Sequence, residues 1–233
     1  MAELLYEGKA KQVYLTDKDD EYLIHYKDDA TAGNGVKHDH FEGKGGLNNT
    51  ISCIIFDMLE EAGIKTHMIK KLNERDILVK KVDIFPLEVI IRNITTGSFC
   101  KRLGAPEGVV LEEPIFEISY KNDDYGDPLI NEDHAVALKL CTREEYNFIK
   151  QETLKINELL KEFFLSLNLK LVDFKIEFGK TPDGEILLAD EISPDSCRLW
   201  DVETNQKYDK DVFRQDIGDL IETYKAVLAR MQK

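Results

Sequence analysis

The segment LVDFKIEFGKTPDGEILLADEISPDSCRLWD, residues 171–201, contains the pattern that decides the fold. Its first part alternates between apolar and charged side chains, which is typical of a β-strand with one face on a core. The apolar face of this predicted strand consists of Val172, Phe174, Ile176 and Phe178, and the charged face of Asp173, Lys175 and Glu177. Taken alone, the pattern is most simply a half-buried strand whose charged face is solvated.

The residues that follow predict a hairpin that aligns two carboxylates. Asp183-Gly184 is the favoured pair for a two-residue type I′ turn. Counting outward from that turn, Glu177 lies directly opposite Asp190, with both side chains on one face. Like charges in this position destabilise a hairpin unless a divalent cation lies between them, and carboxylate oxygens suit Mg²⁺. The prediction depends on the register, because a slip of one residue would put the two carboxylates on opposite faces.

Several polar side chains follow the end of the second strand. In the expected register Glu191 points away from the face that holds Asp190. Asp195 and Arg198 come after a Ser-Pro turn. The single tryptophan, Trp200, is expected to pack and hold the turn in place.

Composition excludes several functional classes. The chain has 233 residues, of which 42% are hydrophobic and 33% charged, as in a soluble globular protein with a sizeable core. A net charge of −14 argues against nucleic-acid binding, but local lysines and helix ends still permit small anionic ligands. No apolar run approaches the roughly 20 residues of a membrane span, and the N-terminus does not resemble a secretory signal. Four widely spaced cysteines without a CxxC pair indicate reduced thiols in the cytoplasm.

The first third of the chain predicts a small β-rich lobe. Short strands are expected over residues 4–6, 12–16 and 22–26. A polar, glycine-rich stretch over 28–49 is too long for a simple connector, which indicates a functional loop, and a helix ending at Gly63 is expected from residue 50. Two later β-rich runs break at Phe85-Pro86, and we place the junction of two lobes there, with one lobe over residues 1–84 and the other over 85–233.

The second lobe mixes strands and helices, so the predicted class is α+β. A strand is expected over residues 114–121, and the capping-box pair Thr142 and Glu145 opens a long helix with apolar side chains at helical spacing. A two-strand unit is expected over 169–192. One amphipathic helix is expected from residue 212 to 231.

The N-terminal stretch YEGKAKQVY has features of a phosphate-binding hairpin. Gly8 permits a sharp bend, Lys9 and Lys11 are placed to reach phosphates, and Val13 is placed to pack over a flat base. This arrangement is similar to the glycine-rich hairpin of protein kinases.

A second candidate anion site is IIRNITTGSFCKR, residues 90–102. Arg92 ends an apolar strand, and Ser98 stands at the start of a short helix, where free N–H groups beside an arginine bind anions. An ordinary strand-to-helix turn with an N-cap serine explains the same pattern equally well. The run His38-Asp39-His40 has no third ligand near it in the sequence, which favours a solvated loop over a zinc site.

The motifs VDFKIEFG and LLADEISPDSCRLWD together resemble the two signatures of the phosphoribosylaminoimidazole-succinocarboxamide synthase, or SAICAR synthetase, family of purine biosynthesis. The resemblance extends over essentially the whole chain and includes YEGKAKQVY, TAGNG, GKGGLNN, VIIRNITTGSFCKR and YKNDDYGDP. It implies a two-lobed, ATP-grasp-like α+β fold with a kinase-like N-terminal β lobe, and it implies a homodimer.

The resemblance also implies the reaction. L-aspartate is joined to the carboxylate of 5-amino-1-(5-phosphoribosyl)imidazole-4-carboxylate with consumption of ATP, giving SAICAR, ADP and phosphate. Because a carboxylate does not react directly with an amine, ATP is expected to convert it to an acyl phosphate, which the amine of aspartate then attacks. Mg²⁺ and lysines are expected to neutralise charge during phosphoryl transfer.

Roles for single residues follow from the same resemblance. It implies that ATP is held by Lys9, Lys11, Val13 and Lys121. It implies that Mg²⁺ is held by Glu177 and Asp190, with Asp127 supporting a second metal. It implies that the ribose phosphate is held by Arg92, Ser98 and Arg198, and that the imidazole and its carboxylate are lined by Asp173, Lys175 and Asp195. The TAGNG loop, in which Asn34 stands where some members have aspartate, and the GKGG segment are expected to close over the substrates near the L-aspartate site.

Two rival functions are compatible with the same lobes. A small-molecule kinase is disfavoured because the HRDxxxxN and DFG motifs are absent from the sequence. A non-catalytic nucleotide-binding protein would not need this set of acids, lysines and arginines. The expected partners are small-molecule substrates, rather than nucleic acids or membranes.

Overall fold

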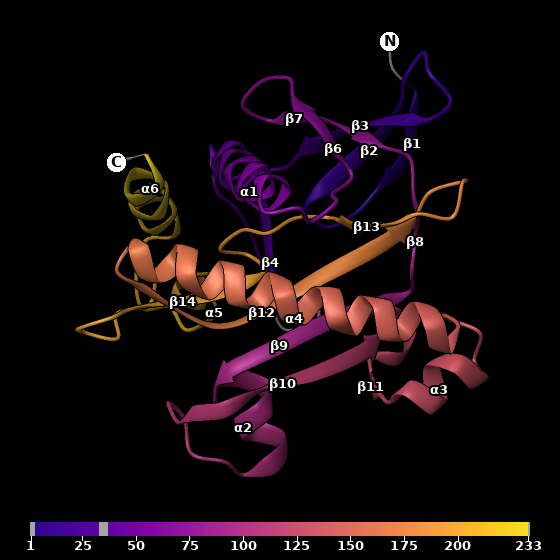
Figure 1. The fold of residues 1–233 in the computed structure, drawn as a ribbon. Helices are drawn as coiled ribbons and strands as arrows, with labels where there is room; N and C mark the ends of the chain where they lie inside the picture. The colour runs from indigo at the N-terminus through magenta and orange to yellow at the C-terminus, as the bar shows by residue number, and fades with distance from the viewer. Residues whose placement is uncertain (1–2, 33–36, 233) are drawn as a thin grey trace.

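The N-terminal part of the chain forms a five-stranded antiparallel sheet (Figure 1). The computed structural model describes residues 3–32 and 37–232, and the strand order in this sheet is β1-β2-β3-β7-β6. Its strands are β1 (Leu4–Glu7), β2 (Lys11–Leu15), β3 (Glu21–Tyr26), β7 (Asp76–Lys80) and β6 (Met68–Lys71). The strands predicted over residues 4–6, 12–16 and 22–26 are therefore confirmed as β1, β2 and β3.

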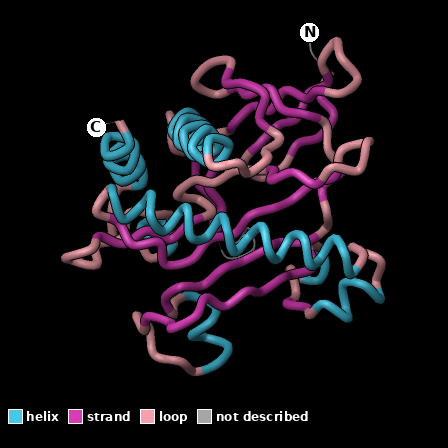
Figure 2. Tube along the Cα trace, viewed as in Figure 1, coloured by secondary structure: helices cyan, strands magenta, loops and turns pink. Residues whose placement is uncertain are grey.

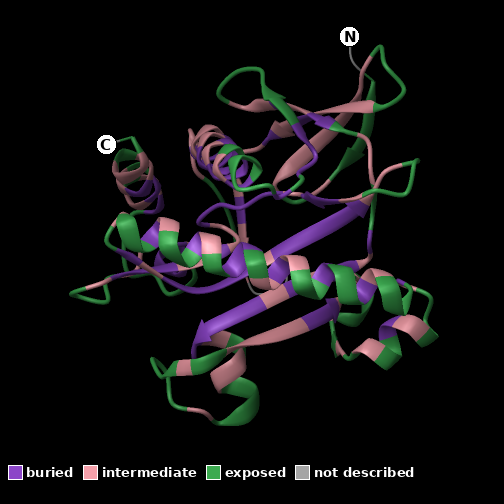
Figure 3. Cartoon of the chain, viewed as in Figure 1, coloured by how far each residue is buried: buried purple, intermediate pink, exposed green. Residues whose placement is uncertain are grey.

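A larger antiparallel sheet forms the second part of the molecule. Its path is β11-β10-β9-β12-β13, and β14 and β8 also pair with β12. The strands are β11 (Leu129–Ile130), β10 (Val110–Tyr120), β9 (Leu87–Ile94), β12 (Leu169–Lys180), β13 (Ile186–Ala189), β14 (Cys197–Asp201) and β8 (Asp83–Ile84). Figure 3 shows β9 and β12 as largely buried strands, because α4 packs on both of them. With helices and strands mixed in this way, the predicted α+β class is confirmed.

Helices pack around the sheets, as Figure 2 shows. They are α1 (Lys44–Glu61), α2 (Gly97–Leu103), α3 (Glu132–Ala137), α4 (Arg143–Ser166), α5 (Asp211–Arg214) and α6 (Leu220–Met231), with a 3₁₀ turn over Asp123–Tyr125. Both halves of the predicted capping box are present at α4, where Thr142 and Glu145 exchange side-chain-to-backbone hydrogen bonds. Within the described part of the chain, no helix is both long and apolar enough to cross a membrane.

Much of the polar stretch over residues 28–49 forms regular structure, as residues 28–32 and 37–49 show. It forms a hairpin of β4 (Asp29–Ala32) and β5 (Lys37–His40), and α1 begins at Lys44 rather than at residue 50. A Cβ at Gly45 would lie 2.4 Å from the carbonyl oxygen of Tyr26, so the glycine permits α1 to start in contact with β3. Residues 33–35 of the TAGNG loop, Asn34 among them, lie outside the described residues.

The prediction of a single C-terminal helix over residues 212–231 is wrong. Two helices, α5 and α6, are separated by residues 215–219. Asp216 has a left-handed φ of 54°, and the Asp219 side chain accepts a hydrogen bond from the backbone N–H of Glu222 as the N-cap of α6. The apolar periodicity continues across this break, which is why the pattern alone predicted one helix.

The predicted register of the β12–β13 hairpin is also wrong, by one residue. Glu177 pairs with Ala189 rather than with Asp190, and the turn contains three residues, 182–184. Pro182 has no N–H for a ladder pair and its fixed φ suits the first central position of a type I turn. Gly184 then takes a left-handed φ of 89°, as in a three-residue hairpin loop with a bulge.

The two sheets meet along β13, the second strand of this hairpin. A parallel bridge joins Thr66 to Leu188, and the backbone N–H of His67 donates to the carbonyl oxygen of Leu188 at 2.8 Å. The chain leaves the first sheet at Lys80 and enters the second at β8. The lobe boundary predicted after Ile84 falls at the end of β8, and it stays a prediction.

Candidate active site

The larger of two adjoining cavities lies where the two sheets meet and has a volume of about 680 Å³. Its apolar lining residues come from the first sheet, from β8 and from the residues beside β8: Val13, Ile24, Val79, Val82, Ile84 and Pro86. Its charged lining residues include Lys9, Lys11, Lys121, Lys175, Glu177 and Asp190. A cavity lined by both apolar side chains and a group of lysines and acids fits a flat base followed by phosphates. All four residues predicted to hold ATP line this cavity.

Lys11 of β2 is the most enclosed cation of this cavity. Its Nζ lies 2.6 Å from Asp190 and 3.2 Å from Glu191, and 4.9 Å from the centre of the Tyr26 ring. Burial opposes the charge, but Asp190 and Glu191 together raise the pKa of Lys11 well above its usual value. Lys11 is therefore a permanent positive charge held toward the acids of the second sheet.

Asp190 reaches the cavity although it does not pair with Glu177. Strand β13 ends at Ala189, and Asp190 takes a left-handed φ of 60°, so the alternation of side chains stops there. The same change brings Glu191 to Lys11, where the predicted register had turned it to the opposite face. The expected meeting of Glu177 and Asp190 in one cavity is thus produced by the strand end and not by the hairpin register.

Glu177, which is buried, and Asp190, which is half-buried, form a carboxylate pair with lysine partners. Both oxygens of Glu177 accept hydrogen bonds from Lys121, at 2.7 and 2.6 Å. Burial and the charge of Asp190 raise the pKa of Glu177. Burial alone would raise the pKa of Asp190, but the charge of Lys11 outweighs this effect and lowers the pKa of Asp190 to about 2. A further cation between the two acids would relieve their repulsion.

The donor set at this pair fits Mg²⁺. This ion is commonly held by one or two carboxylates together with substrate phosphates and water, and Glu177 and Asp190 supply two carboxylates. Within residues 3–32 and 37–232, no three His, Cys, Asp or Glu side chains converge in a metal-binding cluster. Asp127 lines the same cavity, but it is not gathered with the other two acids, and it accepts a hydrogen bond from the backbone N–H of Asn122 at 2.8 Å.

The smaller cavity has a volume of about 160 Å³ and is lined by several cationic side chains. Arg92 of β9, Ser98 of α2 and Arg198 of β14 all line it. Nη2 of Arg92 donates to the Ser98 hydroxyl at 3.1 Å, and one oxygen of Asp173 accepts from Arg92 at 3.3 Å and from Arg198 at 2.8 Å. Asp173 therefore acts in this structure as the link that holds two guanidinium groups side by side.

Lys175 lines both cavities. It is paired with Glu88 of β9. Burial alone would lower the pKa of Lys175, but Glu88 and then Glu177 raise it, so the side chain is a cation and not a base. A positive charge at the junction of the two cavities is placed to stabilise negative charge that passes between their ligands.

Asp195 borders the smaller cavity, but its carboxylate is already engaged. Lys44 and the Tyr224 hydroxyl each lie 2.5 Å from its oxygens, and Lys210 lies 3.5 Å away. Burial opposes ionisation, yet Lys44 and then Lys210 hold the pKa of Asp195 far below its usual value. The geometry gives Asp195 a structural role in holding α1 and α6, and direct contact with the imidazole stays a prediction.

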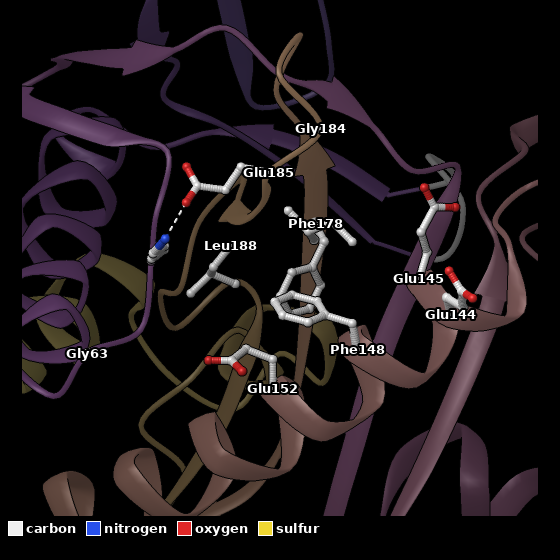
Figure 4. Close-up of a pocket in the computed structure, with 11 residues that line it drawn as sticks. Gly63, Glu144, Glu145, Phe148, Glu152, Phe178, Gly184, Glu185 and Leu188 are labelled. Carbon is white, nitrogen blue, oxygen red and sulfur yellow. Dashed lines mark hydrogen bonds and ion pairs between the residues drawn. The ribbon is translucent and has the colours of Figure 1, made fainter.

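A third cavity, of about 480 Å³, lies on the other side of the β12–β13 hairpin (Figure 4). Phe148, Phe178 and Leu188 form its apolar floor, and Lys65 is paired with Glu185 at its rim. Phe178 points into this third cavity, whereas the adjacent Glu177 lines the larger of the two adjoining cavities, as strand alternation requires. None of the residues predicted for the site lines it.

Several residues of the site were not predicted from the sequence. Glu88 could have been found, since alternation along β9 places it on the face of Arg92. Arg214 of α5 lines the smaller cavity, and no local pattern indicated this. His67 lines the larger cavity, and in the described part of the chain its Nε2 has no hydrogen-bond partner. Burial lowers the pKa of His67 to about 4, so the ring is neutral near pH 7.

Comparison with known proteins shows the family to which this chain belongs. A family model described as SAICAR synthetase matches residues 4–231. A phosphoribosylaminoimidazole-succinocarboxamide synthase of Finegoldia magna is 68% identical over 230 residues, which cover 99% of each chain. The crystal structure of the synthase of that name from Ehrlichia chaffeensis has a TM-score of 0.97 at 45% identity and covers 99% of this chain and 98% of its own.

A solved SAICAR synthetase in complex with ADP is also similar, with a TM-score of 0.94, 50% identity, and coverage of 97% of this chain and 96% of its own. The match of the family model and the identity to the relatives both extend over nearly the full length. The chain therefore belongs to the SAICAR synthetase family and is an ATP-dependent ligase of purine biosynthesis.

Proposed function

We propose that the two adjoining cavities bind the two phosphate-bearing substrates of the SAICAR synthetase reaction. ATP occupies the larger one, with its base against Val13 and its phosphates toward Lys11 and Lys121. The imidazole ribonucleotide places its phosphate between Arg92 and Arg198. The observation that supports this division most strongly is that Lys175 lines both cavities. The ADP complex of a relative that is 50% identical supports the use of ATP.

The reaction follows from this arrangement. The carboxylate of the imidazole attacks the γ-phosphorus of ATP, so that an acyl phosphate forms and ADP leaves. The amine of L-aspartate then attacks the acyl carbon, and phosphate leaves as the amide bond forms. Lys11, Lys121 and Lys175 offset the negative charge that spreads over the phosphoryl oxygens. Mg²⁺ bound by Glu177 and Asp190 would add charge neutralisation between the phosphates of the nucleotide.

Asp173 and Asp195 are proposed to act mainly by holding cations. Asp173 accepts a hydrogen bond from both Arg92 and Arg198 and so keeps the two guanidinium groups beside each other for the phosphate. Asp195 holds Lys210 near the smaller cavity while its other partners bind it to the scaffold. Both carboxylates also border the place where the imidazole ring would lie.

Omission of single substrates tests this function. ADP release is measured with ATP, Mg²⁺, the imidazole carboxylate and L-aspartate, and then with each omitted in turn. Sustained turnover is expected only with the complete mixture. Equal ADP release without L-aspartate would contradict the ligase mechanism and favour a small-molecule kinase.

Three further properties are proposed on the family resemblance. The protein is a cytoplasmic homodimer, and it consists of an N-terminal nucleotide-binding lobe and a C-terminal catalytic lobe. The exposed apolar side chains of the edge strand β1, Leu4, Leu5 and Tyr6, are compatible with a contact between subunits. Sedimentation equilibrium tests the dimer, and a monomer at micromolar concentration would overturn it.

A further inference from the structure

We propose that Gly97 is a positioning residue that holds the guanidinium of Arg198 in the orientation needed for the substrate phosphate. The proposal rests on the function assigned above to Arg198. Gly97 is the first residue of α2, and Arg198 lies on β14, so the two are brought together only by the fold.

The backbone of Gly97 lies directly against the guanidinium group. A Cβ at residue 97 would lie 2.7 Å from Nη2, 2.9 Å from Cζ and 3.0 Å from Nη1 of Arg198. Three nearly equal distances mean that the planar group presents its flat side to Gly97. Gly97 also has a left-handed φ of 58°, which an L-residue adopts only at a cost.

Acidic partners hold the edge of the same guanidinium. Nε donates to Asp211 at 3.0 Å, and Nη1 donates to Asp173 at 2.8 Å. Within residues 3–32 and 37–232, Nη2 of Arg198 donates no hydrogen bond to the protein, while the side chain lines the smaller cavity. Nη2 is thus the donor left for a ligand, and it is also the atom nearest to the missing Cβ of Gly97.

A methyl group at residue 97 would therefore displace the ligand-binding nitrogen first. Arg198 cannot move away easily, because Asp173 and Asp211 hold its other two nitrogens. The expected consequence is weaker binding of the imidazole ribonucleotide, without a direct effect on the ATP cavity.

The matched pair Gly97→Ala and Gly104→Ala tests this inference. Gly104 follows the same helix and has a left-handed φ of 66°, but a Cβ added there would have no neighbour within 4 Å. Gly104→Ala therefore introduces the same kind of backbone strain as Gly97→Ala without the steric contact. We expect Gly97→Ala to raise KM for the imidazole ribonucleotide at least tenfold and to leave KM for ATP within twofold. Gly104→Ala is expected to leave both within twofold.

Arg198→Lys separates the failure of this proposal from failure of the proposed function. If Arg198→Lys leaves KM for the ribonucleotide unchanged, the assignment of Arg198 to the phosphate is wrong. If Arg198→Lys raises that KM but Gly97→Ala behaves like Gly104→Ala, the role of Gly97 is wrong. With both roles correct, Gly97→Ala adds less than twofold on the Arg198→Lys background, because the guanidinium that it displaces is gone.

The inference can also be tested if Gly97→Ala prevents folding. If Gly97→Ala alone does not fold, removal of the guanidinium should restore folding in the double variant Gly97→Ala/Arg198→Lys. A double variant that also fails to fold would show that Gly97 acts on something other than Arg198, and the inference would be overturned.

Discussion

The backbone at Asp190 determines which acids lie together in the larger cavity. Its left-handed backbone ends the alternation of β13, so that Asp190 and Glu191 both reach Lys11, at 2.6 and 3.2 Å. Glu177 meets them from β12 with Lys121 as its partner. Each of these acids thus has a lysine nearby. An acid of this cluster can exchange its lysine partner for a metal ion, and a lysine can exchange its acid partner for a phosphate.

Substitution of Glu177 by glutamine tests the carboxylate pair. Glu177→Gln keeps the shape of the side chain but removes one negative charge, so we expect kcat to fall roughly 100-fold or more through loss of charge stabilisation at the metal site. The measurement is ADP release across a Mg²⁺ titration, and the melting temperature should change by only a few degrees.

Glu185→Gln is the control for that variant. Glu185 pairs with Lys65 on the surface and does not line either of the two adjoining cavities. Its substitution should leave the Mg²⁺ dependence unchanged. Near-normal turnover in Glu177→Gln would reject the carboxylate pair as the metal site.

At the scale of secondary-structure elements, Asp195 ties three parts of the chain together. It lies in the turn between β13 and β14, Lys44 is the first residue of α1, and Tyr224 belongs to α6. The side chains of Lys44 and Asp195 are 1% and 7% exposed, so the network is screened little by water. These contacts hold α1 and α6 against the strand end that supplies Asp190 and Glu191.

Removal of one hydroxyl measures the contribution of α6 to this network. Tyr224→Phe leaves one oxygen of Asp195 without its donor, which should lower the free energy of unfolding by about 1–3 kcal/mol. Urea unfolding of Tyr125→Phe is the control, because Tyr125 is 71% exposed and its loss should change stability by less than about 0.5 kcal/mol. Equal effects of the two substitutions would contradict the network.

The pH dependence of stability tests the charge on Asp195. Because the pKa of Asp195 is lowered on folding, its ionised form contributes stability above the unfolded pKa of about 3.9, and this contribution is lost as pH falls toward the folded pKa. Asp195→Asn should therefore be less stable than wild type by about 3–5 kcal/mol at pH 7. Urea unfolding between pH 6 and 2.5 should show this gap narrowing below about pH 4. A gap that stays constant would show that the charge is not what stabilises the fold.

At the scale of the whole molecule, the larger cavity lies at the interface of the two sheets and is lined by residues of both. The first sheet supplies Val13 and Lys11, and the second supplies Glu177 and Lys175. A ligand in this cavity contacts both sheets at once, so binding is expected to stabilise them as one unit.

Thermal unfolding with ADP and Mg²⁺ tests this expectation. At a ligand concentration 100-fold above Kd, the stabilisation is about 2.7 kcal/mol, which for a chain of this size raises Tm by roughly 5–10 °C. Chelation of Mg²⁺ with EDTA should remove much of the shift. An undiminished shift in EDTA would contradict a metal-linked role for the acids, and two separate transitions would contradict the stabilisation of the two sheets as one unit.

The sequence by itself determined the local elements and the chemical inventory. Period-two alternation predicted β12 and the Thr142–Glu145 capping box predicted α4, because these signals depend only on neighbouring residues. The ligase reaction was predicted by the resemblance of the sequence motifs to the SAICAR synthetase family. The register of the β12–β13 hairpin depends on Pro182, which has no N–H for a ladder pair, so counting outward from Asp183-Gly184 was wrong by one residue. The bend at Asp190, the contact of Gly97 with Arg198 and the place of Lys175 between two cavities were decided by the tertiary structure alone, because each depends on the packing of segments far apart in the chain.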